Sequence, residues 1–222
     1  HHRKMGAHAT IAATPVPKAE VSGFGLMQLN DDFTIRSFIE KPTDPAVVRQ
    51  YMMSPAVLRS LNRPDDAEYG LASMGIYLSN ADVLVESLAT DDADFGKEVI
   101  PGLLGRKKLS GYVFDGYWED IGTVKAFFEC NLNLTEPNPS FNFFHPHDRI
   151  YTRARYLPAS RMSGCKVGQA IIADGCILQD ATFDRCVIGV RSVVGSKSRL
   201  KNVVLMGNYY YENEMTSLEA TG

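Results

Sequence analysis

QAIIADGCILQDATFDRCVIGVRSVVGSKSRL, residues 169–200, decides the fold of the second half of the chain. Apolar side chains recur every six residues within it, in the two series Ile171, Ile177, Phe183 and Ile188, Val194, Leu200. Gly189 and Gly195 follow the first two members of the second series. A six-residue apolar period with small turn residues indicates a left-handed parallel β-helix, in which each hexapeptide forms one side of a triangular coil.

The repeat is short, and its register slips by one residue between the two series. A small β-meander therefore stays open as the alternative fold. About two coils are visible, fewer than a free-standing solenoid needs, because each unit buries its apolar face only against its neighbours. We therefore expect residues 164–222 to be the start of a β-helix, and the chain to be a piece of a longer polypeptide.

The first half of the chain alternates β-type segments with helical ones. We expect strands over 8–15, 24–29, 34–40 and 71–78, and a further strand that ends at Trp118. We expect helices over 46–53, 81–88, 95–104 and 124–134, because their preceding residues are favourable at helix N-termini: Pro45, Asn80, the acidic Asp91, Asp92 and Asp94, and Thr123. Strands separated by helices of this length predict an α/β domain with a mixed sheet.

A third segment separates these two patterns. Residues 135–163 carry several prolines and many aromatic side chains with no steady period, which indicates an ordered connector lying across a surface. The predicted organisation is therefore an α/β domain over 1–134, a connector over 135–163 and a partial β-helix over 164–222.

The composition excludes several classes of protein. The hydrophobic fraction is 45%, the charged fraction 22% and the formal charge -3, so electrostatics gives no reason to expect a nucleic-acid partner. No apolar stretch approaches the roughly 20 residues of a membrane span. The four cysteines lack both C-x-x-C spacing and the density of a secreted disulfide framework, so we expect reduced thiols and an intracellular protein.

FIEKP, residues 38–42, is the first candidate binding motif. A Glu-Lys pair that ends a strand before a proline places two unlike charges at a sheet edge, where open α/β sheets bind ligands. Lys41 is suited to a phosphate and Glu40 to sugar hydroxyls. Taken alone, this motif is better explained by a surface ion pair before a turn.

Two further motifs are ambiguous in the same way. ASMGIY, residues 72–77, has small residues inside a strand, which allow a ligand or simply another backbone to approach closely. DFGKEVIP, residues 94–101, places an acid and an aromatic residue at the start of a helix, which alone indicates capping.

GYWEDIGT, residues 116–123, is the most informative motif. Asp120 is predicted to lie in the turn before a helix, where its carboxylate suits a hard cation such as Mg²⁺ that keeps phosphates in its other coordination sites. Trp118 is suited to wall a pocket. The structural alternative is an interfacial tryptophan beside helix-capping acids.

The four motifs, in this order and spacing, closely resemble the second half of the catalytic domain of ADP-glucose pyrophosphorylase (glucose-1-phosphate adenylyltransferase). The likeness continues through FNFFHPHDRIYTRARYLPAS and VVLMGNYYYE, and its wording is closest to plant, algal and cyanobacterial members. The resemblance implies the C-terminal half of a Rossmann-like nucleotidyltransferase domain over 1–134, followed by the start of the β-helix.

The resemblance also implies an activity and a set of site residues. Members of this family make ADP-glucose and pyrophosphate from ATP and glucose 1-phosphate, with Mg²⁺ as cofactor, for starch or glycogen synthesis. Lys41 would hold the sugar phosphate, with Lys41 and Asp120 as the catalytic residues and Asp120 as a metal ligand. The sugar pocket would consist of Glu40, Lys41, Ser73, Tyr77, Asp94, Phe95 and Trp118. An allosteric homo- or heterotetramer is implied, in the plastid stroma of a plant or alga or in the bacterial cytoplasm.

The sequence lacks several segments that members of the family carry, among them the segment with the second metal-binding aspartate and the end of the β-helix. The glycine-rich loop G-G-x-G-T-R-L that cradles the ATP phosphates does not occur, so we expect this polypeptide alone to be inactive. A non-catalytic regulatory subunit of the heterotetramer and another sugar-1-phosphate nucleotidyltransferase stay open as alternatives. A hexapeptide-repeat acyltransferase is disfavoured, because no histidine falls within residues 164–222.

Overall fold

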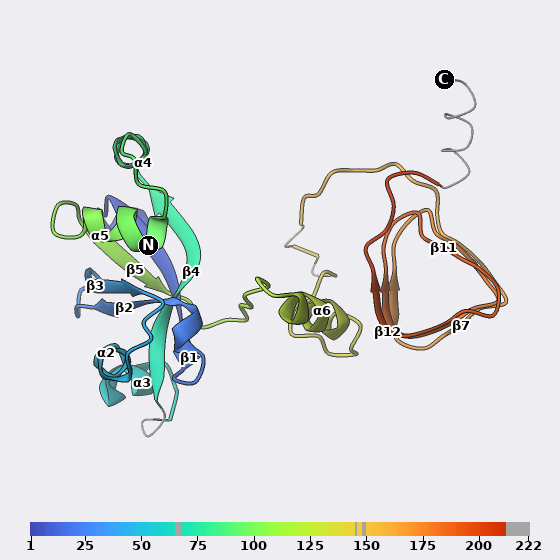
Figure 1. Cartoon of the computed structure of the whole chain (residues 1–222), viewed down its shortest axis with the longest axis horizontal. Helices are drawn as coiled ribbons and strands as arrows, with labels where there is room; N and C mark the ends of the chain where they lie inside the picture. Colours follow the sequence, from blue (N-terminus) through green and yellow to red (C-terminus); the bar gives the residue numbers. More distant parts are fainter. Residues whose placement is uncertain (65–67, 145, 148–149, 212–222) are drawn as a thin grey trace. The chain divides into compact units, whose positions relative to one another are not determined.

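The computed structural model describes residues 1–64, 68–144, 146–147 and 150–211. The chain forms two compact units, His1–Trp118 and Glu119–Gly222. The first is built around a β-sheet and the second around a coil of short strands (Figure 1). Among the helices of the described residues, none has the length and apolar character needed to cross a membrane.

The first unit contains a five-stranded sheet in the order β3-β2-β4-β1-β5. Its strands are β1 (Ala9–Pro17), β2 (Gly25–Leu29), β3 (Ile35–Glu40), β4 (Tyr69–Ser79) and β5 (Leu109–Val113). β1 pairs parallel with β5 and antiparallel with β4, while β2 pairs antiparallel with both β3 and β4. The predicted α/β class with a mixed sheet is therefore confirmed.

Short helices and turns connect these strands. They are α1 (His2–Met5), η1 (Val21–Gly23), α2 (Pro45–Gln50), α3 (Pro55–Ser60), α4 (Ala81–Leu88), the π-helical turn η2 (Phe95–Val99) and α5 (Ile100–Leu103). Asp44 and Ser54 accept backbone N–H bonds at the starts of α2 and α3, and each is followed by a proline at the first helical position. The sequence analysis missed α3, although its start carries the same proline signal as α2.

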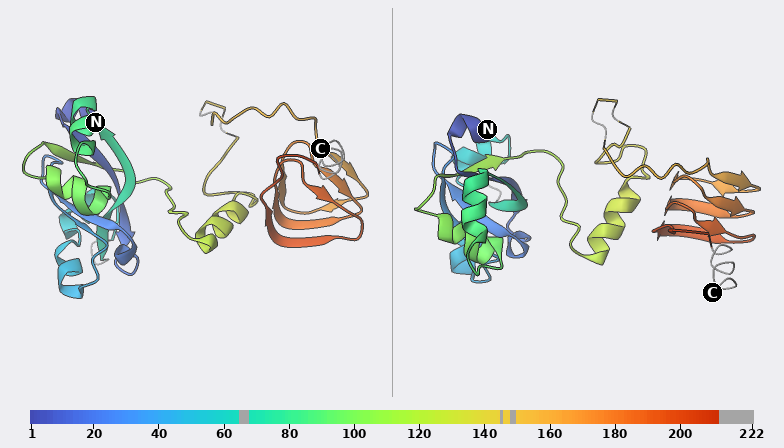
Figure 2. Two further views of the ribbon diagram at one scale, coloured as in Figure 1. Left: turned by 45° about the horizontal axis from the view of Figure 1, so that its top comes forward. Right: turned by 90° about the horizontal axis from the view of Figure 1, so that it is seen from above.

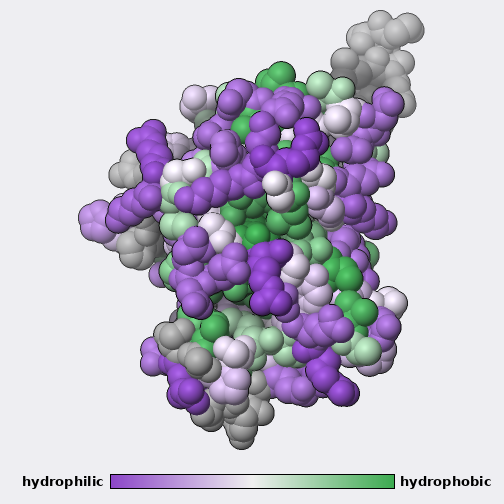
Figure 3. All heavy atoms as spheres, turned by 90° about the vertical axis from the view of Figure 1, so that its left-hand side faces the viewer, coloured by the Kyte–Doolittle hydropathy of each residue, from purple (hydrophilic) through white to green (hydrophobic). Residues whose placement is uncertain are grey.

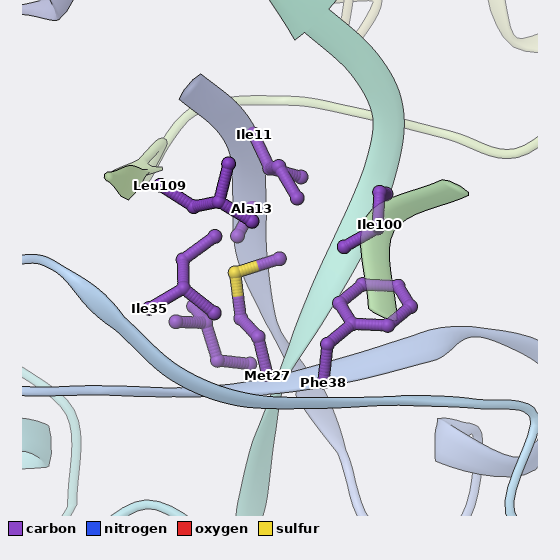
Figure 4. Close-up of a cluster of buried hydrophobic side chains, with 8 residues drawn as sticks. Ile11, Ala13, Met27, Ile35, Phe38, Ile100 and Leu109 are labelled. Atoms are coloured by element: carbon purple, nitrogen blue, oxygen red, sulfur yellow. The ribbon is translucent and has the colours of Figure 1, made fainter. Parts of the chain in front are cut away.

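Apolar side chains cover both faces of the sheet. On one face, β1, β2, β3 and β5 contribute side chains that converge with one from α5, and Figure 4 labels Ile11, Ala13, Met27, Ile35, Phe38, Ile100 and Leu109 among them. The other face carries a second cluster around Leu26 and Ala72. Because Leu26 and Met27 are neighbours in β2, their side chains point to opposite faces, and the strand is buried on both.

The second half of β4 and the helix α4 expose apolar side chains. More than half of the surface of Ile76, Leu78, Val85 and Leu88 is accessible. A space-filling view of one face of the molecule shows apolar residues framed by hydrophilic ones (Figure 3). The first unit therefore has apolar surface that the described residues leave uncovered.

The second unit contains a parallel β-helix. Its strands are β6 (Arg161–Ser163), β7 (Lys166–Val167), β8 (Ala170–Ile172), β9 (Ile177–Gln179), β10 (Thr182–Ile188), β11 (Val193–Val194) and β12 (Arg199–Leu205). β10 pairs parallel with β7, β8 and β12, and β9 pairs parallel with β6 and β11. The coils have a three-sided outline end on (Figure 1) and stack rung upon rung in Figure 2. A β-meander requires antiparallel pairs, so that alternative is wrong.

The interior of this coil agrees with the second predicted apolar series. Ile188 is 0% exposed and Val194 is 8% exposed. Leu200 is partly buried against the same cluster.

The first predicted series was right at Phe183 and wrong by one residue at its two other members. Ile172 and Leu178 pack in the core, rather than the predicted Ile171 and Ile177. Residues with positive φ are five apart from Gly175 to Asp180 and to Arg185, and six apart from Arg185 to Arg191 and to Lys197. Two sides of the coil are therefore a residue shorter than a hexad, which accounts for the register slip seen in the sequence.

The helix α6 (Val124–Asn133) packs on the β-helix, against β10 and β12. Thr123 caps it as predicted, with its hydroxyl accepting from the N–H of Ala126 at 3.1 Å. Leu132 is 1% exposed, and Arg185 donates to Glu136 just beyond the helix at 2.9 Å. The sequence analysis placed this helix in the domain over 1–134, whereas the compact units divide between Trp118 and Glu119.

Candidate functional site

The end of β3 carries the first two predicted site residues. Glu40 is the last residue of the strand, and Lys41 follows in the left-handed region with a φ of 44°. A non-glycine residue in this region is strained, and such residues cluster at functional sites. The Lys41 ammonium lies 3.8 Å from the Glu40 carboxylate, and its side chain is 61% exposed while that of Glu40 is 19% exposed. The lysine is therefore open to a ligand and the glutamate is largely enclosed.

Two glycines make room for the Glu40 carboxylate. A side chain at Gly25 would place its Cβ 2.6 Å from Oε2 of Glu40, and a Cβ at Gly96 would overlap the same oxygen. Both glycines are buried. The carboxylate is thus cradled between two backbone segments, from β2 and from η2, that a larger residue would close.

Asp94 is the N-cap of the π-helical turn η2. Its Oδ1 accepts from the N–H groups of Gly96 at 2.8 Å and Lys97 at 3.0 Å. These backbone bonds, that of Lys97 first, lower the pKa of Asp94 below its ordinary value of 3.8 against the opposing effect of burial, and the charges of Lys97 and Lys41 act in the same direction as the bonds. The Asp94 carboxylate is therefore fixed by backbone bonds, and it lies close enough to Lys41 for the charge of the lysine to lower its pKa.

Tyr77 and Phe95 form a stacked aromatic pair. Their rings stack with centroids 5.5 Å apart and planes inclined by 19°. Burial raises the pKa of Tyr77 above 10.0; a hydrogen bond with Ser73 opposes this shift, and the charges of Glu40 and Asp94 add to it. The structure thus brings together six of the predicted residues: Glu40, Lys41, Ser73, Tyr77, Asp94 and Phe95.

Trp118 is half-buried at the end of the first unit. Its ring meets that of Phe24 edge-on, with centroids 5.6 Å apart. The carbonyl of Phe24 in turn accepts from the N–H of Lys41 at 3.2 Å. Phe24 therefore connects the two residues: its ring contacts Trp118, and its carbonyl is hydrogen-bonded to the backbone of Lys41.

The strand before Trp118 ends earlier than predicted. β5 ends at Val113, and the N–H of Phe114 makes one more bond, to the carbonyl of Ala13. The ring of Phe114 then folds over Gly116, leaving no room for a Cβ there. This local turn takes the chain out of the sheet, so the prediction of a strand up to Trp118 was wrong.

Asp120, the predicted metal ligand, lies in the second compact unit. It is exposed, in a turn before α6 where its Oδ1 accepts from the N–H of Gly122 at 3.2 Å. Within the described part of the chain, no three His, Cys, Asp or Glu side chains gather as a metal-binding group. A lone exposed carboxylate nevertheless fits Mg²⁺, which is commonly bound by one or two carboxylates together with substrate phosphates.

Sequence reasoning missed the parts that support these side chains. Gly25 and Phe24 fall within the strand predicted over 24–29, and no local sequence pattern marks them as part of a site. Gly96 was visible within DFGKEVIP, but its contact with Glu40 joins residues far apart in the sequence and could be found only in three dimensions.

Comparison with models of known families defines the class of this protein. Residues 1–137 match the model described as nucleotidyl transferase, and residues 155–221 match the GLGC left-handed parallel beta-helix domain. The second match also gives the hand of the coil, as predicted. The chain belongs to the nucleotidyl transferase family, and this pair of domains agrees with the resemblance to ADP-glucose pyrophosphorylase found in the sequence.

Proposed function

We propose that this chain is part of a glucose-1-phosphate adenylyltransferase and that its first unit supplies the binding site for glucose 1-phosphate. The observation that carries the proposal is the enclosed Glu40 carboxylate beside the exposed Lys41 ammonium. A sugar phosphate has one end that needs a cation and another that needs acceptors for its hydroxyl groups. Lys41 supplies the cation and Glu40 the acceptor, as neighbours at the end of β3.

Each side chain has a role in this proposal. Lys41 pairs with the phosphate, and Glu40 accepts hydrogen bonds from the sugar hydroxyls. Asp94 is a second acceptor, because its two backbone bonds use Oδ1 and leave Oδ2 for a ligand. Tyr77, Phe95 and Trp118 provide apolar surface for the sugar ring, and Ser73 orients the Tyr77 hydroxyl.

The reaction is a substitution at phosphorus. An oxygen of the sugar phosphate attacks the α-phosphorus of ATP, the bond from this phosphorus to the oxygen bridging to the β-phosphorus breaks, and pyrophosphate leaves. The task of the residues named above is to hold the attacking phosphate in one orientation. Bound Mg²⁺ would neutralise charge on the phosphates, with Asp120 as the ligand from this chain.

The identity of the sugar can be tested directly by calorimetric titration of the chain with glucose 1-phosphate, galactose 1-phosphate and mannose 1-phosphate. We expect glucose 1-phosphate to bind most tightly, because enclosed acceptors penalise a misplaced hydroxyl group. Equal binding of all three would instead favour a general sugar-1-phosphate nucleotidyltransferase. Absence of binding by any of them would contradict the proposal.

The nucleotide and the assembly belong to the same proposal. ATP as the second substrate, a homo- or heterotetrameric parent and a place in starch or glycogen synthesis all follow from the resemblance in the sequence. A catalytic parent is favoured over a regulatory subunit, because all the sugar-pocket residues are present. Assay of the parent with ATP and UTP tests the nucleotide, and we expect turnover with ATP.

A further inference from the structure

The segment that follows β5 leaves the sheet and leads to Trp118. After the bond from Phe114 to Ala13, the carboxylate of Asp115 meets the guanidinium of Arg63, with Oδ1 2.6 Å from Nη2. At its other end the segment reaches the contact between Trp118 and Phe24. Arg63 and Asp115 are 52 positions apart in the sequence, so this ion pair ties two distant loops together.

Arg63 is itself held in place. Its guanidinium carbon lies 5.0 Å from the ring centroid of Tyr69, the first residue of β4, which is a cation–π contact. The Arg63 side chain is 28% exposed, less than the 44% of Asp115. The arginine is therefore the fixed member of the pair, anchored on the sheet, and the aspartate is held by it.

The Nε of Arg63 is buried, and the described residues offer it no hydrogen-bond acceptor. The two contacts of Arg63, with the carboxylate of Asp115 and with the ring of Tyr69, hold the guanidinium between the segment after β5 and the start of β4.

We propose that Arg63 is a positioning residue for Trp118: by holding Asp115, it sets the path of residues 115–118 and thereby the orientation of the indole. The consequence for sugar binding rests on the proposed function, in which Trp118 lines the sugar site. The orientation of the indole does not depend on that function.

The experiment uses Trp118 as a reporter, because it is the only tryptophan of the chain. Acrylamide quenching and fluorescence anisotropy are measured without ligand for the wild type, Arg63→Ala and Asp115→Asn. We expect quenching to rise and anisotropy to fall in both variants, because the indole is then no longer held in one orientation. The exchanged pair Arg63→Asp with Asp115→Arg should restore much of the wild-type signal, which general loss of packing would not do.

Lys18→Ala is the matched control. Lys18 pairs with Glu68 at 2.7 Å, next to the start of β4, and both partners are partly exposed. Removal of this ion pair should leave the fluorescence of Trp118 unchanged.

The outcomes separate this inference from the proposed function. Wild-type quenching and anisotropy in both Arg63→Ala and Asp115→Asn would overturn the positioning role, and Asp115→Asn keeps the test valid if Arg63→Ala does not fold. A changed signal in the variants supports the positioning role even if the wild type fails to bind glucose 1-phosphate, a result that would contradict the proposed function alone. If the wild type binds, we expect the affinity of both variants to fall by roughly two- to fivefold.

Discussion

Tyr77 stacks on Phe95, joining the exposed half of β4 to the first residue of η2. The two residues lie in separate motifs of the sequence, ASMGIY and DFGKEVIP. Their contact brings two individually ambiguous motifs together in the candidate site.

Replacement of Tyr77 tests this contact. Tyr77→Ala removes the stacked ring, so we expect glucose 1-phosphate affinity to fall roughly three- to tenfold, in line with about 0.5–1.5 kcal/mol for an aromatic pair. Tyr77→Phe keeps the ring and loses the hydroxyl, and should have a smaller effect. Calorimetry measures both, and equal effects of the two variants would contradict the stacking role.

Substitution of Gly96 tests whether this glycine leaves the space that the Glu40 carboxylate needs. Gly96→Ala would push a Cβ into the Glu40 carboxylate, and we expect glucose 1-phosphate binding to fall about tenfold or more, because an ångström-scale misplacement has large effects. Gly102→Ala in α5 is the control, because a Cβ there meets nothing within 4 Å. If the two variants bind alike, Gly96 does not position Glu40.

The acid stability of the chain should depend on Asp94. Because folding lowers the pKa of this carboxyl group, its contribution to stability is present above the unfolded value of 3.8 and is lost as the pH falls through the lower folded pKa. Asp94→Asn should therefore show a smaller loss of stability between about pH 5 and pH 2 than the wild type does. Thermal melts across this range measure the effect, and Asp91→Asn, an exposed aspartate nearby, should retain the wild-type profile.

The packing of the β-helix core can be tested by replacing Phe183. Phe183 is 0% exposed, and Phe183→Ala should lower the free energy of unfolding of the second unit by about 3–5 kcal/mol. Phe144 is 85% exposed, and Phe144→Ala should leave it nearly unchanged. Urea denaturation followed by far-UV circular dichroism separates the two, and a loss below 1 kcal/mol at Phe183 would contradict its place in the core.

Local signals in the sequence predicted much of the fold. Periodicity and capping residues were enough for β1 to β4, α4 and α6, because these elements have regular apolar patterns or a clear start. Two members of the first apolar series of the β-helix were missed by one residue, since the sides that end at Asp180 and Arg185 hold five residues where the prediction assumed six. The end of β5 was missed because the apolar alternation continues past Val113 while the backbone turns away.

The candidate site was predicted less completely than the fold. The charged and aromatic side chains stand out in motifs, but their supports are long-range contacts: Gly25 and Gly96 with Glu40, Phe24 with Trp118, and Arg63 with Asp115. Such contacts depend on tertiary structure and leave no local pattern.

The most direct test of the central claim, that the first unit binds the sugar phosphate, is a titration of the chain with glucose 1-phosphate, with and without Mg²⁺, followed by Trp118 fluorescence. We predict saturable quenching in the wild type and in Lys125→Ala, whose lysine makes an exposed pair in α6. Lys41→Ala should weaken binding roughly ten- to hundredfold, as expected for loss of a charge-assisted bond. Absence of saturable quenching in the wild type, or unchanged affinity in Lys41→Ala, would contradict the account.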